Sequence, residues 1–162
     1  MIRDAAIEDL PSIVGIYNAA IPARLATADL EPVTIASRRA WFGEHSRATR
    51  PLWILVDGNE VHGWLSFQSF YGRPAYHATA EISVYVAPNA QRRGYGRQLM
   101  TQAIAQAPAM GLRTLLGFIF GHNEPSLALF RSFGFATWAR LPNVAELDGV
   151  ERDLLIVGRR IG

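Results

Sequence analysis

Residues 84–97 read VYVAPNAQRRGYGR, and this stretch decides the fold. An alternating apolar strand ends before Pro88, a short turn follows, and a helix begins at two glycines spaced by one residue, Gly94 and Gly96. The first N–H groups of a helix have no partner within it, and the helix dipole adds partial positive charge there. Because glycine lets an anion approach the backbone closely, the junction predicts a phosphate or pyrophosphate site.

Arginine is the only basic side chain that this site can use. All 16 basic residues of the 162-residue chain are arginine, and Arg92, Arg93 and Arg97 flank the two glycines. The absence of lysine excludes Schiff bases, anchored pyridoxal phosphate and a P-loop, and the absence of cysteine excludes thiolate nucleophiles and thiolate metal sites. A surface turn with solvated arginines is the simpler explanation of the stretch by itself. The net charge of +2 is too small to predict nucleic-acid binding.

Helical and strand patterns alternate around this junction and predict one domain over residues 1–162. Apolar periodicity predicts helices over 7–20, 34–44, 94–110 and 126–133, and strands over 2–3, 52–56, 61–68, 81–86, 114–120, from 137 onward, and over 154–157. Hairpins come early and a strand–helix–strand unit comes late, which indicates an α+β, three-layer α/β/α domain. The N-terminus is not a signal peptide, and no run approaches the ~18 apolar residues of a membrane span. We therefore expect a cytoplasmic protein with no membrane partner.

Two segments resemble the GNAT family of N-acetyltransferases. Residues 91–96 (QRRGYG) are similar to its acyl-CoA pyrophosphate loop, Q/R-x-x-G-x-G/A. Residues 123–126 (NEPS), followed by 133–135 (FGF), are similar to its second cosubstrate segment, with the same order and spacing. The resemblance implies the GNAT fold, a central mixed and mostly antiparallel sheet flanked by helices. It also implies an enzyme that transfers an acetyl group from acetyl-CoA, as cosubstrate, to a primary amine.

Further stretches resemble the phosphinothricin and methionine sulfoximine acetyltransferase branch of that family. The resemblance covers about residues 1–140 and implies a small, amino-acid-like amine as substrate and a homodimer. The stretches that carry it are 16–18 (IYN), 26–28 (ATA), 31–32 (EP), 41–42 (WF) with His45, 73–76 (RPAY), and 81–86 (EISVYV), which matches E-x-S-V-Y-V.

The resemblance implies catalytic roles for one strand, residues 81–86. An amine is protonated near neutral pH and must lose its proton before it attacks, so a carboxylate is needed beside the thioester. The family's catalytic glutamate corresponds to Glu81, although a glutamate paired with an arginine on a sheet face is also possible. In the GNAT fold, backbone N–H groups of this strand donate to the acyl oxygen, and the pantetheine arm pairs with the same backbone. These groups correspond to Val84, Tyr85 or Val86.

The resemblance also implies contacts to both substrates. An arginine can pair with a carboxylate through two hydrogen bonds, so Arg73 is the expected partner of the acceptor's carboxylate, with Tyr76 and Tyr85 lining the pocket. A solvated loop arginine is the alternative for Arg73, and a helix N-cap is a compatible role for Asn123. No residue spacing predicts a metal site, and we expect His62 and His77 at the surface. The remaining cosubstrate contacts are expected from Arg92, Arg93, Gly94, Tyr95, Gly96, Arg97 and Asn123.

Two departures from the family pattern leave other functions open. Many GNAT enzymes have a tyrosine that protonates the leaving thiolate, and the matching residue here is Phe130. The branch's K-F-G-x-W-x-D stretch, which helps form the substrate site and the dimer, reads LDGVERD over 147–153, so that only Gly149 and Asp153 match. Another acceptor (a polyamine, an antibiotic or a peptide N-terminus) or a non-catalytic acyl-CoA-binding module therefore stays possible.

Overall fold

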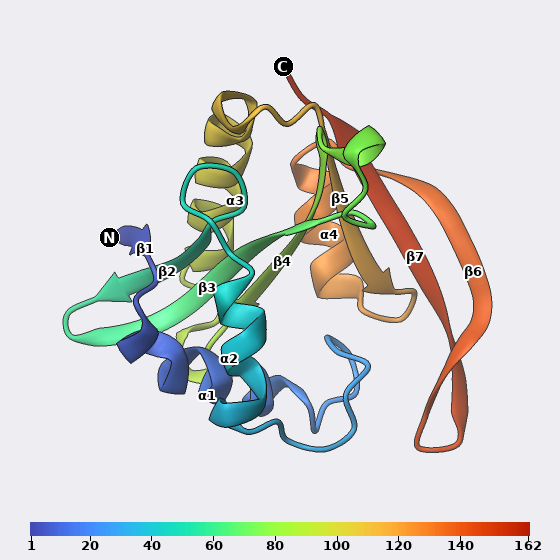
Figure 1. Ribbon diagram of the computed structural model, residues 1–162. Helices are drawn as coiled ribbons and strands as arrows, with labels where there is room; N and C mark the ends of the chain where they lie inside the picture. The colour runs from blue at the N-terminus through green and yellow to red at the C-terminus, as the bar shows by residue number, and fades with distance from the viewer.

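Seven strands form one mixed sheet in the order β1-β2-β3-β4-β5-β7-β6 (Figure 1). The computed structural model describes all residues from 1 to 162. Only β4 and β5 run parallel to each other, and every other neighbouring pair is antiparallel. The mixed, mostly antiparallel sheet implied by the sequence is therefore confirmed. The strands are β1 Ile2–Asp4, β2 Leu52–Asp57, β3 Glu60–Ser69, β4 Thr79–Val86, β5 Thr114–Phe120, β6 Ala136–Leu147 and β7 Val150–Arg160.

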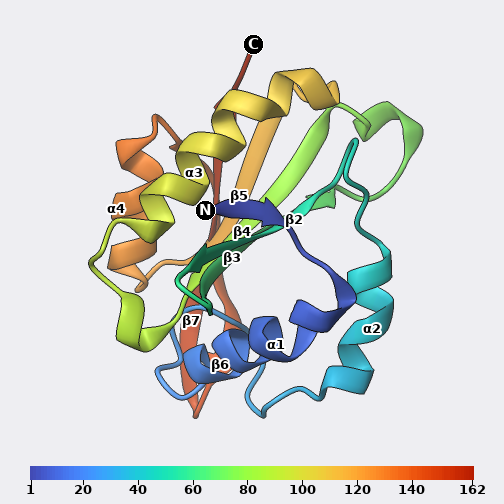
Figure 2. The same cartoon turned by 90° about the vertical axis from the view of Figure 1, so that its left-hand side faces the viewer.

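Helices cover both faces of this sheet (Figure 2). They are α1 Leu10–Ala20, α2 Ile35–Gly43, α3 Tyr95–Gln106 and α4 Glu124–Ser132. Successive residues of a strand point to opposite faces. On β3, Trp64 donates from Nε1 to the Ile13 carbonyl of α1 at 3.1 Å. A Cβ on the preceding Gly63 would instead lie 3.4 Å from Leu99 of α3. The first two helices and the last two helices therefore lie on opposite faces.

Helix ends differ from the predicted ones where a cap or a proline intervenes. The first predicted helix starts as a 3-10 turn over Ile7–Asp9 before α1 begins. The third ends early, because α3 gives way to a 3-10 turn over Ala107–Met110 that contains Pro108. The fourth starts earlier than predicted, because Asn123 caps it by accepting a hydrogen bond from the Ser126 N–H at 3.3 Å.

The strands near the C-terminus are longer than the sequence predicts. β6 and β7 form a long hairpin that curls at the side of the molecule (Figure 1). Asp148 and Gly149 make its turn with φ values of 53° and 79°. Two successive positive φ values are typical of the tight turn whose twist matches a hairpin. The pattern of alternating residues is interrupted by bulges in β6, which is why the sequence did not reveal the full length.

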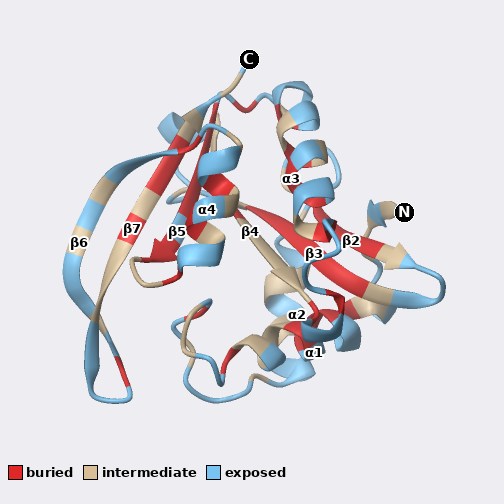
Figure 3. Ribbon diagram, turned by 180° about the vertical axis from the view of Figure 1, so that it is seen from behind, coloured by how far each residue is buried: buried red, intermediate tan, exposed pale blue.

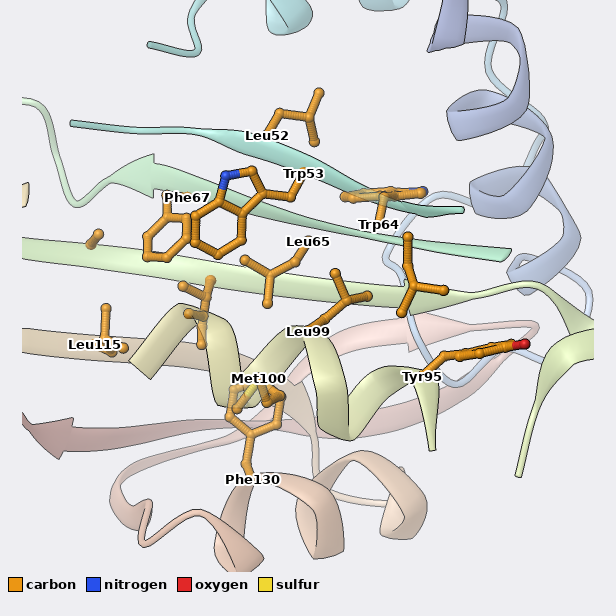
Figure 4. Packing of buried hydrophobic residues seen from close by; sticks show 14 of the residues in the cluster. Leu52, Trp53, Trp64, Leu65, Phe67, Tyr95, Leu99, Met100, Leu115 and Phe130 are labelled. Carbon is orange, nitrogen blue, oxygen red and sulfur yellow. The ribbon is translucent and has the colours of Figure 1, made fainter. Parts of the chain in front are cut away.

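The core fills both faces of the sheet (Figures 3 and 4): Ile13 and Ile16 of α1 belong to it on one face, and residues of α3 and α4 on the other. Leu99 and Met100 are fully buried there, and Phe130 of α4 is 3% exposed. A Cβ on Gly63 would lie 3.0 Å from the Tyr85 carbonyl oxygen, so the absence of a side chain here allows β3 and β4 to approach closely.

One histidine lies elsewhere than the sequence suggested. His62 is buried rather than at the surface, because its ring stacks on Tyr95 with a centroid separation of 5.3 Å. His77 is exposed, as expected. No helix has the length and apolar character that a membrane span requires.

We predict that Gly117→Ala destabilises the protein by about 1–3 kcal/mol, because overpacking a dense core has that effect. The new Cβ would lie 2.7 Å from the Phe130 ring. Urea unfolding of both proteins measures the difference. Gly15→Ala is the matched control: this exposed helical glycine has no atom within 4 Å of a built Cβ, so the change is expected to stabilise by about 0.5–1 kcal/mol. Equal stability of the Gly117 variant and the wild type would contradict the packing argument.

Candidate active site

The parallel strands β4 and β5 pair over a short length and then separate (Figure 1). Their register consists of Thr79 with Thr114, Ala80 with Leu115, and Glu81 with Leu116. A cavity of about 450 Å³ lies where they part, lined by β4, β5, α4, the β6–β7 hairpin and residues 25–28 of the loop after α1. The backbone edges of two strands thus face a space that no protein strand fills.

Alternation along β4 shows which backbone groups face that space. The Ala87 N–H donates to the His62 carbonyl at 2.8 Å, so the polar groups of Ala87 point to β3. In an antiparallel pair every second residue does the same, which assigns Tyr85 to β3 as well. Val84 and Val86 direct their N–H and C=O groups the other way, into the gap. We expected a backbone donor from Val84, Tyr85 or Val86. The N–H groups of Val84 and Val86 face the gap and are available, whereas that of Tyr85 is not.

Glu81 lies at the last residue pair before the strands part. Its carboxylate lines the cavity and makes no ion pair with any arginine, so the paired surface glutamate considered from the sequence is not what the structure shows. Burial raises the pKa of the Glu81 carboxyl, and no hydrogen bond offsets that effect. A carboxylate with a raised pKa is a stronger base than an ordinary glutamate.

The turn from β4 into α3 presents a row of unpaired amides. No N–H group from residue 91 to residue 97 donates to any backbone or side-chain acceptor, and the first donor that does is Gln98, to Gly94. Arg92 and Gly94 have φ values of 64° and 79°, in the left-handed region. Such turns direct successive N–H groups toward one point and form anion-binding concavities. The residues present therefore fit a pyrophosphate, with the exposed side chains of Arg92 and Arg93 beside it.

The side chains of Tyr95 and Arg97 point away from this row of amides. Tyr95 is 9% exposed, and its hydroxyl donates to Asp57 Oδ2 at 2.7 Å. Arg97 donates to Ser132 Oγ at 2.9 Å and lies over the Phe133 ring at 4.9 Å. Tyr95 thus fixes the start of α3 to the β2–β3 turn, and Arg97 fixes α3 to α4. Both residues can meet a phosphate through their backbone N–H, and their side chains hold that backbone in place.

Three side chains hold the loop that forms another wall of the cavity. His122 Nε2 donates to the Arg24 carbonyl at 2.8 Å, Asn123 Nδ2 to the Leu25 carbonyl at 3.2 Å, and the Tyr85 hydroxyl to the Ala26 carbonyl at 2.8 Å. Asn123 therefore combines the predicted cap with an anchor for this loop. The sequence offered no sign of the His122 contact, which joins residues 98 positions apart.

Two of the predicted acceptor residues lie outside the cavity. The side chain of Arg73 is exposed and has no hydrogen-bond partner in the chain, and Tyr76 is 41% exposed. Tyr76 contacts Phe70, which in turn contacts Phe118 of the cavity lining, with ring centroids 5.4 Å and 6.5 Å apart. Tyr76 does not line this cavity, because the Phe70 ring lies between them, and its contact with the acceptor stays a prediction. Tyr85 does line it.

The altered segment 147–153 has a structural role. Asp148, in the β6–β7 turn, accepts a hydrogen bond from Arg24 Nε at 2.8 Å and so joins that hairpin to the loop after α1. Asp153 accepts from Arg140 at 2.6 Å and from the Asn143 N–H at 2.9 Å. Phe130, which replaces the tyrosine of many family members, lines the cavity and can donate no proton. No group of three or more His, Cys, Asp or Glu gathers where it could hold a metal ion.

Comparison with known proteins identifies the class of enzyme. Residues 13–135 match the model of the acetyltransferase (GNAT) family. The chain is 47% identical over 161 residues to YwnH of Bacillus subtilis (strain 168), provisionally named a phosphinothricin acetyltransferase, covering 99% of this chain and 98% of YwnH. It is 35% identical over 154 residues to the L-methionine sulfoximine/L-methionine sulfone acetyltransferase of Pseudomonas aeruginosa, covering 94% and 90% of the two chains.

A solved structure agrees with these relatives. The phosphinothricin acetyltransferase of Sinorhizobium meliloti in complex with acetyl-CoA superposes with a TM-score of 0.93 at 28% identity, covering 100% of this chain and 88% of that one. This chain belongs to the GNAT acetyltransferase family. It is an N-acetyltransferase that uses acetyl-CoA.

We predict that Gly94→Val weakens CoA binding by about 10–100-fold, because it removes charge-assisted hydrogen bonds to phosphate worth roughly 1.5–3 kcal/mol. Valine is strained at the φ of 79° that Gly94 adopts and would turn the amides away. Titration calorimetry with CoA measures the affinity. Gly111→Val is the matched control, since Gly111 has the same φ of 79°, equally open space around its Cα, and a position at the far end of α3. Equal CoA affinity of the two variants would rule out the phosphate site.

Proposed function

We propose that this enzyme moves the acetyl group directly to the primary amine of a small amino-acid-like acceptor of the phosphinothricin or methionine sulfoximine type, in a ternary complex. The observation that carries the proposal is the unpaired carboxylate of Glu81 at the point where β4 and β5 separate, beside the backbone groups of Val84 and Val86. The relatives named for phosphinothricin and methionine sulfoximine support the acceptor class.

Glu81, the backbone of β4 and the turn into α3 have separate roles in the proposed reaction. Acetyl-CoA supplies the acetyl group as a thioester, so that a carbon–nitrogen bond forms and the carbon–sulfur bond breaks. Glu81 takes the proton that the acceptor's ammonium group must lose, directly or through one water. The N–H of Val84 or Val86 donates to the acyl oxygen, where negative charge develops. The amides of residues 91–97, with Arg92 and Arg93, hold the pyrophosphate, and Asn123 lies where it can contact the rest of the cosubstrate.

Direct transfer fits the composition of the chain. With no cysteine, the protein has no thiol that could carry the acetyl group between the two substrates. The thiolate of CoA is stable enough to leave without first receiving a proton. The reaction can therefore proceed with Phe130 in place of the tyrosine that protonates the thiolate in many GNAT enzymes. The exposed Arg73 is kept as the proposed partner of the acceptor's carboxylate, although it lies outside the cavity.

We also propose a homodimer. Three large apolar side chains of the β6–β7 hairpin are exposed, Trp138 by 49%, Val144 by 56% and Val150 by 48%. Val144 also lines the cavity, so a second chain on this hairpin would lie next to the site. Light scattering that gives the mass of one chain at micromolar concentration would refute the dimer.

We predict that Glu81→Gln slows acetylation at neutral pH by about 10²–10⁴-fold and leaves CoA affinity unchanged. A protonated carboxyl cannot accept a proton, so kcat falls as pH drops through the pKa of Glu81. Because burial raises that pKa, the fall occurs at higher pH than for an ordinary glutamate, and it is absent in the variant. The measurement is kcat against pH, with the exposed Glu8→Gln as control. A variant that keeps both the rate and the acid limb would exclude Glu81 as the base.

The acceptor class is tested by measuring thiol release from acetyl-CoA with a panel of amines. We expect phosphinothricin, methionine sulfoximine and methionine sulfone to give kcat/KM values at least about tenfold above a polyamine, an aminoglycoside and a peptide N-terminus, a difference of roughly 1.4 kcal/mol. Turnover of only the last three would overturn the acceptor assignment. CoA binding with no amine-dependent release would indicate the non-catalytic module instead.

A further inference from the structure

Four polar side chains form a contiguous patch on the face of β3 and β4 that α1 and α2 cover. Ser66 lies opposite Ser83, and Gln68 lies opposite Glu81, so all four point to the same face. None of the four side chains has a hydrogen-bond partner in the chain, although Ser66 is only 1% exposed. Buried polar groups in proteins are nearly always hydrogen-bonded. Gln68, Ser83 and Glu81 are half-buried, and the Ser66 hydroxyl is not sealed off from solvent, so all four side chains can bond to a ligand or to water.

Three of these side chains form the polar wall of a second cavity. Ser66, Gln68 and Ser83 line a space of about 170 Å³ between α1, α2 and the sheet. Its other walls are aromatic and aliphatic side chains: Ile13, Val14, Tyr17, Val33, Trp41, Trp64 and Tyr85. Ser83 and Tyr85 also line the larger cavity that holds Glu81, so the two spaces are neighbours. A molecule with its amine at Glu81 can extend its side chain past Ser83 into the smaller space.

The charge of this cavity is already balanced. Arg38 lines it with a guanidinium group 4.7 Å from the centroid of the Tyr17 ring, and pairs with Asp29 at 3.1 Å. The Glu81 carboxylate is next to Gln68 across the strands. The cavity therefore offers a ligand hydrogen-bonding groups but no unpaired cation.

The dimensions limit the ligand further. The volume of about 170 Å³ is close to the roughly 150 Å³ of a protein cavity that binds benzene, so it holds a group of about six non-hydrogen atoms. That corresponds to a short carbon chain with a compact head. The carbon chain would contact the aromatic walls, and the head would accept from the two hydroxyls and exchange hydrogen bonds with the Gln68 amide.

We propose that Ser66, Gln68 and Ser83 form the subsite for the acceptor's side chain, and that this subsite selects a head rich in hydrogen-bonding oxygen or nitrogen, such as a sulfone or a sulfoximine, over an apolar one. The proposal rests on the proposed function, since it places the amine of the same acceptor at Glu81. It adds three specificity-determining residues on the sheet, away from Arg73.

The test compares Ser66→Ala and Ser83→Ala with wild type on two acceptors of similar size, methionine sulfone and norleucine. Each variant removes one hydrogen bond worth about 0.5–1.5 kcal/mol, so KM for methionine sulfone is expected to rise about 2–10-fold while KM for norleucine stays the same. The matched control is Ser69→Ala, on the same strand but outside both cavities, where the hydroxyl accepts from Arg50 Nε at 3.1 Å. CoA affinity should be equal in all four proteins.

A binding measurement separates this proposal from the proposed function. Trp41 and Trp64 line the subsite, so methionine sulfone added to the CoA-bound protein should change tryptophan fluorescence without any turnover. If no amine is acetylated but this change occurs and weakens in Ser83→Ala, the subsite stands and the proposed function fails. If both serine variants match Ser69→Ala on both acceptors, or affect both acceptors equally, the cavity holds only water and the subsite is wrong.

Discussion

β4 and β5 are held together by the pairs that end at Glu81 and Leu116, and beyond this point neither strand bonds to the other. Both stay extended because each has a second neighbour: β3 continues along β4, and β7 continues along β5. Unpaired backbone groups inside a protein are unfavourable unless something satisfies them. The open edge of β4 is therefore a ready-made strand-pairing surface for an extended substrate arm. The same separation leaves Glu81 half-buried without a partner, and this burial raises the pKa of its carboxyl.

The proposed pyrophosphate site contains no lysine. Backbone amides supply fixed dipoles that cannot swing away, and Arg92 and Arg93 add charge from the solvent side. The geometry of such a turn depends on what lies beneath it. Tyr95 connects the start of α3 to the β2–β3 turn, and Arg97 connects it to α4. These two side chains point away from the row of amides and hold its backbone in place. Recognition and support are thus divided between backbone and side chain within a few residues.

Much of the fold and part of the site could be predicted from the sequence, because both depend on local patterns. Period-two alternation identified β4 with Glu81, and the paired glycines identified the turn into α3. Contacts between distant segments could not be predicted. The burial of His62 depends on Tyr95, and the role of His122 depends on a carbonyl 98 positions away. Arg73 and Tyr76 were assigned by motif alone, and the packing of the loop around them decides that they lie outside the cavity.

The loop after α1 has no regular secondary structure, yet it is held by three hydrogen bonds that all end on main-chain carbonyls, those of Arg24, Leu25 and Ala26. Every amino acid offers the same carbonyl, so these anchors do not depend on which side chains the loop carries. The side chains of Leu25, Ala26 and Ala28, which line the cavity, can therefore change during evolution while these anchors persist, whereas Thr27 also holds the loop through a hydrogen bond between its hydroxyl and that of Tyr17. A wall fixed by its backbone allows an enzyme to drift from one acceptor to another without first losing the shape of its site.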